Sequence, residues 1–88
     1  MKVRKRENPL DAVQFTGNNQ AEVERFIGED GHTKLLYNRK GIINQIQISF
    51  CYGYVRTLGI GDYLIKNRNE MYDRVNADVF KRCYEVLE

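Results

Sequence analysis

Apolar and polar residues alternate most regularly between positions 42 and 50. Successive side chains of a β-strand point to opposite faces, so this segment is predicted to be a strand with one buried and one wet face. The buried face is expected to hold Ile46, Ile48 and Phe50, and the wet face Gln45, Gln47 and Ser49.

Shorter segments with strand character lie on both sides of this one. They are separated by turns rich in glycine and asparagine, residues that tolerate turn conformations. The predicted strands are 10–16, 33–38, 54–58, 62–66 and 70–75. Residues 1–6 are expected to form an edge strand or a basic arm, and residues 84–87 a last strand or the end of a helix.

Two segments follow the helical period instead. Residues 20–27 place apolar side chains on one stripe, after two asparagines that can cap a helix and before Gly28, a natural stop. Asn76 is expected to cap a second helix over residues 77–83. The predicted fold class is therefore α+β: one small domain spanning residues 1–88, with a mostly antiparallel sheet of about five or six strands and two short helices.

Length and composition narrow the class of protein. A chain of 88 residues buries one core and leaves little room for a deep pocket. No apolar run approaches the roughly 20 residues that cross a bilayer, and no apolar segment follows the basic start, so neither a membrane span nor a signal peptide is expected. Cys51 and Cys83 lack metal-site spacing and are expected to be reduced and buried in a cytoplasmic protein.

Residues suited to catalysis are few. His32 is the single histidine and is expected in a surface turn, without spacing that would pair it with a cysteine nucleophile. Asp62 follows Gly61 and is expected to bind backbone donors of a turn. The glycines at 59 and 61 belong to no phosphate-binding motif. We therefore predict a protein that is not an enzyme, with no catalytic, metal or cofactor site.

Surface binding is the better expectation. The net charge is only +2, which does not by itself favour nucleic acid. Basic residues nevertheless cluster at the start of the chain and again near position 40, and tyrosines flank Gly53. Aromatic and arginine side chains are common anchors at protein interfaces, and exposed tyrosines can stack on bases. The predicted interaction surface comprises Lys2, Arg4, Arg6, Arg39, Lys40, Tyr52 and Tyr54, with Tyr37 as a further exposed aromatic residue.

Several segments resemble small proteins of tailed phages and prophages. That family begins with a basic stretch of the form MKVRKKP…EAVQFTG, continues with a short helix ending in glycine, and finishes with GDYIIKG…GEFY…DIFEKTYE. The corresponding segments here are 1–6, 11–17, 21–28, 61–66, 70–72 and 77–85. The chain departs from the family at Ile60 and Ala77, where proline is common, and differs most over residues 31–57.

The resemblance implies a phage or prophage accessory protein made in the bacterial cytoplasm, and it implies no reaction. The most favoured function is a non-enzymatic module that binds a host or phage protein. The alternative is a nucleic-acid-binding accessory protein that uses a basic N-terminal arm and exposed tyrosines. A small-molecule binder remains a third hypothesis, and the free edges of a small sheet are also compatible with a homodimer.

Overall fold

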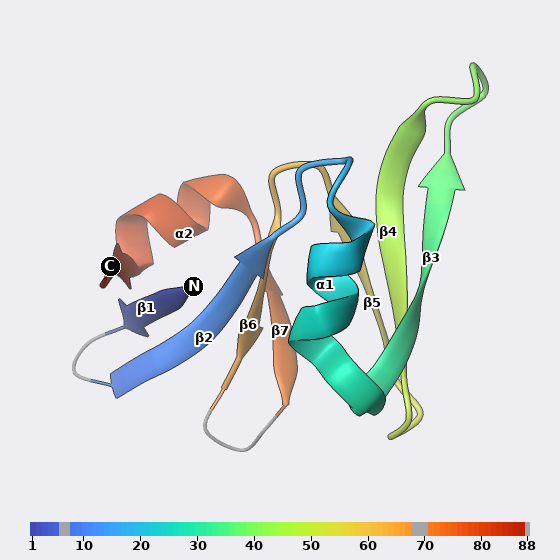
Figure 1. The fold of residues 1–88 in the computed structure, drawn as a ribbon. Coiled ribbons are helices and arrows are strands. Elements are labelled where there is room, and N and C mark those ends of the chain that lie inside the picture. Colours follow the sequence, from blue (N-terminus) through green and yellow to red (C-terminus); the bar gives the residue numbers. More distant parts are fainter. Residues whose placement is uncertain (6–7, 68–70, 88) are drawn as a thin grey trace.

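The protein is described by a computed structural model that covers residues 1–5, 8–67 and 71–87, without the side chains at positions 4, 5, 8 and 9. Within this part of the chain, two antiparallel sheets and two α-helices make up the fold (Figure 1). The five-stranded sheet has the order β7-β6-β2-β1-β8 and the three-stranded sheet the order β3-β4-β5.

The elements alternate between the two sheets along the chain. The five-stranded sheet comprises β1 (Lys2–Lys5), β2 (Asn8–Gln14), β6 (Tyr63–Lys66), β7 (Tyr72–Val75) and β8 (Glu85–Val86). The three-stranded sheet comprises β3 (Gly31–Tyr37), β4 (Ile43–Phe50) and β5 (Val55–Gly59). The helices are α1 (Gln20–Ile27), the short 3₁₀ helix η1 (Gly28–Asp30) and α2 (Ala77–Cys83).

The predicted α+β class is confirmed, and both helices have the predicted bounds. The strands differ from the expectation of one sheet with five or six strands, since eight strands form two sheets in the described residues. Residues 2–5 are neither an edge strand nor an arm, because β1 lies between β2 and β8. The pairing of Val3 with Val86 and of Arg4 with Glu85 joins the two ends of the chain.

Both faces of the five-stranded sheet carry buried side chains, so apolar residues occur at successive positions of its strands instead of at every second one. On one face, Val13 and Phe15 pack with α1 and the three-stranded sheet. On the other face, Ala12 packs under α2 together with Phe80. The first and larger cluster comprises Val13, Phe15, Val23, Ile27, Ile46, Ile48, Phe50, Leu58, Leu64 and Tyr72. The second comprises Val3, Ala12, Ile65 and Phe80.

Strand β4 confirms the predicted alternation. Its residues Ile46, Ile48 and Phe50 are buried, whereas the intervening side chains are only partly covered. Antiparallel pairing with β3 is regular until a register shift between Leu36 and Tyr37. This bulge lies close to the turn that leads into β4, where the ladder ends.

Cys51 and Cys83 are both exposed, which corrects the expectation that they are buried. Cys51 lies in the turn after β4, and its thiol contacts the Glu29 carbonyl oxygen at 3.3 Å. Cys83 is the last residue of α2, and its side chain is exposed although Phe80, one turn earlier, is buried. His32 is exposed as expected, but it lies within β3 rather than in a turn.

None of the helices in the described ranges has the length and apolar character needed to cross a membrane.

The start of α2 provides a first test. The Asn76 side-chain oxygen accepts a hydrogen bond of 2.8 Å from the Val79 N–H, which would otherwise lack a partner in the helix. We expect Asn76→Ala to lower the free energy of unfolding by about 1 kcal/mol in urea titrations, because this cap is lost. Asn76→Asp should retain most of the stability, since a carboxylate caps equally well. Equal losses in both variants would contradict the capping role.

Candidate functional site

The structure does not gather the predicted interaction residues on one surface. Arg39 and Lys40 lie in the turn between β3 and β4, whereas Tyr52 and Tyr54 follow the opposite end of β4. Strand β4 separates the two groups by roughly 25 Å at about 3.3 Å per residue. Tyr37 lies at the Arg39 end, so it forms no patch with Tyr52 and Tyr54.

The remaining predicted residues lie at the start of the chain. Lys2 is on β1, and its ammonium group contacts the Asp11 carboxylate at 2.7 Å. Only the backbone of Arg4 is described, and it pairs with residues of β2 and β8. Arg6 lies outside the described residues. The basic start is therefore built into the five-stranded sheet as far as it is described.

The tyrosines around Gly53 begin a row of stacked rings that leads into the core. Tyr52 is 58% exposed and lies 6.2 Å, centroid to centroid, from Tyr54. Tyr54 stacks on Phe50 at 4.6 Å, and Phe50 stacks on Tyr72 at 4.7 Å. Tyr72 is fully buried. Tyr52 is thus an exposed aromatic residue as predicted. Tyr54 is half-buried where β5 of one sheet meets β7 of the other, and we call this contact between the two sheets the seam.

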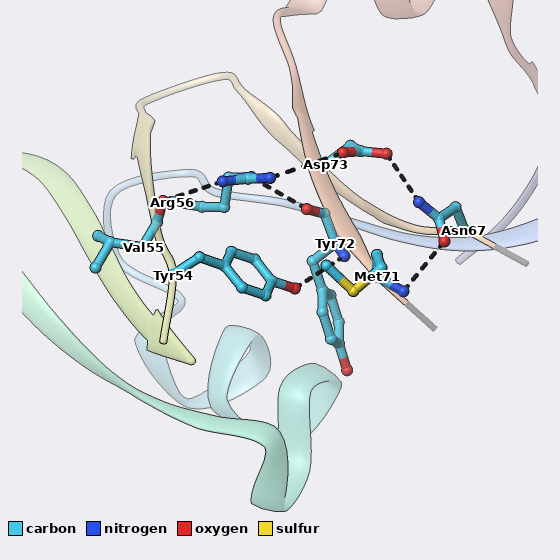
Figure 2. A network of polar contacts seen from close by, with 7 residues as sticks. All are labelled: Tyr54, Val55, Arg56, Asn67, Met71, Tyr72 and Asp73. Carbon is cyan, nitrogen blue, oxygen red and sulfur yellow. Dashed lines mark hydrogen bonds and ion pairs between the residues drawn. The ribbon is translucent and has the colours of Figure 1, made fainter. Parts of the chain in front are cut away.

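At this seam, side chains of β5 and its preceding turn satisfy the backbone of β7 (Figure 2). The Tyr72 N–H donates to the Tyr54 hydroxyl at 3.2 Å, and Arg56 Nε donates to the Tyr72 carbonyl oxygen at 3.1 Å. Arg56 also lies over the Tyr54 ring, 4.7 Å from its centroid. The edge of β7 is therefore occupied at Tyr72 by side chains of the neighbouring sheet.

The surroundings of Tyr72 hold these groups in place. The Asn67 amide donates to the Asp73 carboxylate at 3.0 Å and accepts from the Met71 N–H at 3.1 Å (Figure 2). Arg56 Nη2 lies 4.0 Å from the Asp73 carboxylate. These contacts fix the entry into β7 and orient the guanidinium group toward the seam.

The edge of β5 that does not pair with β4 faces the same seam, and backbone groups at its first and last residues are hydrogen-bonded. The Val55 carbonyl oxygen accepts from Arg56 Nη1 at 3.2 Å. The Gly59 N–H donates to Asp62 Oδ2 at 2.8 Å. Between these ends, the outward backbone groups of Thr57 have no hydrogen bond to a described residue, but this edge faces β7 rather than the outside. At the far side of the five-stranded sheet, strand β8 offers only its two residues.

The remaining sheet edge belongs to β3, and the described side chains do not cap its backbone groups as they do at β7. The Phe50 N–H points to Tyr54 in the direction of β5, and the Cys51 N–H points to Asp30 in the direction of β3. Because backbone groups alternate sides along a strand, His32, Lys34 and Leu36 turn theirs toward β4. The N–H and C=O groups of Thr33 and Leu35 therefore point away from the sheet. No described residue hydrogen-bonds them, and β3 is the outermost strand on that side (Figure 1).

The outer face of the three-stranded sheet adjoins this edge. Its apolar inner face packs on α1 and the five-stranded sheet, whereas the outer side chains belong to neither hydrophobic cluster. By register, the outer face comprises His32, Lys34, Leu36, Gln45, Gln47, Ser49, Val55 and Thr57. We call this set the outer face. It contains hydroxyl, amide and basic groups but no carboxylate.

The residues first considered for catalysis lie apart. Asp62 is buried at the turn after β5, where its carboxylate accepts from the Gly59 N–H and contacts Arg74 Nε at 2.9 Å. This confirms the predicted role of Asp62 in the turn. His32 lies on the outer face of β3. No group of three or more potential metal ligands occurs among the residues that the structure describes.

Tyr72 and Asp30 form a polar link within the aromatic row. The Tyr72 hydroxyl donates to Asp30 Oδ2 at 2.6 Å. This hydrogen bond lowers the pKa of Asp30, with weaker support from Tyr52 and Lys66. Burial of the ring, together with the Asp30 carboxylate, raises the pKa of Tyr72 well above its usual value. The pair is therefore a neutral phenol bonded to a carboxylate at neutral pH, which suits a structural link.

One signal for the β3 site, the distribution of charge along the chain, is present in the sequence although motif searching passes over it. Residues 31–61 contain Lys34, Arg39, Lys40 and Arg56 but no aspartate or glutamate, a net charge of +4. The other 57 residues hold ten basic and twelve acidic side chains. The three-stranded sheet lies entirely within the acid-free segment. Which of its edges stays open depends on tertiary packing.

No family model, curated protein or solved structure matches this chain.

The capped edge of β7 gives a second prediction. We expect Tyr54→Phe to destabilise the protein by about 1–2 kcal/mol, because the buried Tyr72 N–H loses its acceptor. Tyr52→Phe is the matched control, since its hydroxyl contacts Asp30 at 3.3 Å in an exposed position and should matter less. Urea unfolding gives the free energies, and hydrogen exchange of the Tyr72 amide reports the local effect. Unchanged exchange in Tyr54→Phe would contradict the capping role.

The Asp30–Tyr72 link predicts pH-dependent stability at both extremes. The folded-state pKa of Asp30 is lowered, so its contribution is present above the unfolded pKa of about 3.9 and is lost as the pH falls through the folded value. The folded-state pKa of Tyr72 is raised, so its contribution is present below about pH 10 and is lost at higher pH. In urea titrations from acid to alkali, Asp30→Asn should flatten the acid limb and Tyr72→Phe should flatten both. A wild-type acid limb retained in Asp30→Asn would refute the assignment.

Proposed function

We propose that this protein is a non-enzymatic protein-binding module that takes an extended segment of its partner onto the free edge of β3. The observation that carries the proposal is the contrast between the sheet edges. The β7 edge is capped at Tyr72, the β5 edge faces the seam, and β8 is very short, whereas Thr33 and Leu35 present unbonded backbone groups. Exposed strand edges of this kind bind partner strands through main-chain hydrogen bonds.

The side chains next to the edge suit an interface. Leu35 packs against the first cluster and is only partly covered, and Leu36 is half-exposed on the outer face. Thr33 is fixed by its hydroxyl, which accepts from Gln20 and donates to Glu24 at 2.9 Å each. A partner strand would therefore meet an edge whose Thr33 side chain is already held by α1, which limits the ordering cost of binding.

The biological setting that we propose rests on sequence. The terminal segments resemble small phage and prophage proteins, which supports an accessory role in the bacterial cytoplasm with a host or phage protein as partner. The middle of the chain, where the resemblance is weakest, contains β3, β4 and most of β5. If related proteins bind different partners, their sequences should differ most at the binding surface, and the middle of the chain is where this sequence differs most from the family.

Nucleic-acid binding is the second candidate. The turn after β3 places Arg39 and Lys40 next to Tyr37, which is 59% exposed, in the acid-free segment. Basic side chains beside an aromatic ring can hold a phosphate and stack a base. Few cations are gathered there, so the affinity would be low and would fall with salt.

Site-specific cross-linking tests the proposal. A photo-reactive benzophenone side chain is placed at Lys34, beside the edge, or at Lys81 on α2 as a matched exposed control. After nuclease treatment of a bacterial lysate, we expect a protein adduct from position 34 and none from 81.

The adduct should disappear in Leu35→Pro, because proline removes the outward N–H while leaving the bonds to β4 intact. Circular dichroism checks that this variant remains folded, and synthetic N-methyl-Leu35 protein provides the same test with the side chain retained. Equal labelling from both positions would contradict the proposal. In a parallel lysate without nuclease, recovery of nucleic acid that is lost in Arg39→Ala/Lys40→Ala would support the second candidate instead.

A further inference from the structure

We infer that the segment accepted by β3 alternates acidic with uncharged apolar residues, the acidic ones lying over the outer face. This inference rests on the proposed function and adds the chemistry of the partner. It follows from the different charges on the two sides of the free edge.

On the outer side, the edge strand carries only basic or neutral side chains. His32 and Lys34 are exposed there, and the adjacent strand offers Gln45, Gln47 and Ser49. No carboxylate belongs to the outer face, because residues 31–61 contain none. A glutamate on an added strand would lie next to Lys34 and meet donors without a competing acid.

On the inner side of the edge, the nearby charged groups are acidic instead. Thr33 and Leu35 point toward α1, where the Glu24 carboxylate is bonded to the Thr33 hydroxyl at 2.9 Å. Glu22 and Glu24 are exposed on this helix. An acidic side chain entering here would be repelled, whereas an apolar one would extend the packing around Leu35. Because side chains alternate along a strand, the two requirements predict alternating acidic and apolar residues.

A second copy of the same chain fits this edge poorly. Antiparallel pairing of β3 with itself would place the Lys34 ammonium groups of both copies on one face. Like charges on neighbouring strands are destabilising. The partner is therefore expected to be a different, acidic chain, and dimerisation through β3 is an outcome that the test can detect.

The test uses two synthetic peptides of about ten residues, long enough to cover the edge. One alternates glutamate with valine, and the other alternates lysine with valine. Binding is followed by ¹⁵N–¹H spectra of the labelled full-length protein. We expect the glutamate peptide to shift and protect the Thr33 and Leu35 amides and the lysine peptide to leave them unchanged.

Charge reversal supplies the matched control. Lys34→Glu should weaken binding of the glutamate peptide by about three- to tenfold, whereas Lys81→Glu on α2 should leave it unchanged within error. Raising the salt concentration should weaken wild-type binding and narrow the difference between the two variants.

The outcomes separate the inference from the proposed function. Equal binding of both peptides at Thr33 and Leu35 would overturn the acidic preference while supporting strand addition. Shifts confined to other strands, or no binding by either peptide, would overturn the inference even if cross-linking from position 34 succeeds. A concentration-dependent shift of the same amides without peptide would identify a second copy as the occupant and also overturn it.

Discussion

The arrangement of the two sheets depends on how the edge of β7 is satisfied at Tyr72. A buried backbone N–H or C=O without a partner is costly, so a sheet edge inside a protein must be paired or capped. Here Tyr54 and Arg56 provide the acceptor and the donor, and the three-stranded sheet stays separate from the five-stranded one. The Tyr54 ring also stacks on Phe50, so polar and apolar contacts together hold the seam. This capping places the two inner edges of the sheets against each other.

The open edge follows from that arrangement. With β5 turned toward the seam, the other edge of the three-stranded sheet, β3, is on the outside of the molecule. Helix α1 supports its inner side, which leaves the backbone of Thr33 and Leu35 and the outer face available. The distribution of charge also distinguishes this sheet: it contains no acidic residue, and every aspartate and glutamate lies in the segments before or after it. In the proposed function, binding would therefore use the edge of this sheet opposite to the one that stabilises the fold.

Much of the local structure could be predicted from the sequence. The alternation in β4 identified its buried residues, and the bounds of both helices were predicted. The asparagine cap expected for α2 is made by Asn76. The one expected for α1 is not, because the Asn19 side chain bonds to the backbone of Gln14 and Thr16 instead. The position of β1 could not be predicted, because its inner place depends on pairing with β8 at the other end of the chain. The exposure of Cys51 and Cys83 was missed because composition does not say which side of a turn or helix faces solvent.

The candidate site was predictable in its chemistry more than in its location. Tyr52 was expected at the surface and is there, but Tyr54 is committed to the seam, a role that depends on β7. Arg39 and Lys40 lie far along the hairpin from both tyrosines. The free edge of β3 could not be recognised from local pattern, because every strand has two edges and tertiary packing decides which are covered.

The bulge between Leu36 and Tyr37 sets the length of this edge. Regular geometry ends there, and the outward-facing residues before it are only Gly31, Thr33 and Leu35, so an added strand would gain its main-chain bonds at these three positions. Each such bond contributes only about 0.5–1.5 kcal/mol net of the water that it replaces. An attachment this short is suited to rapid exchange: its lifetime would be brief, and a partner held for long would have to be tethered or gripped at a second place.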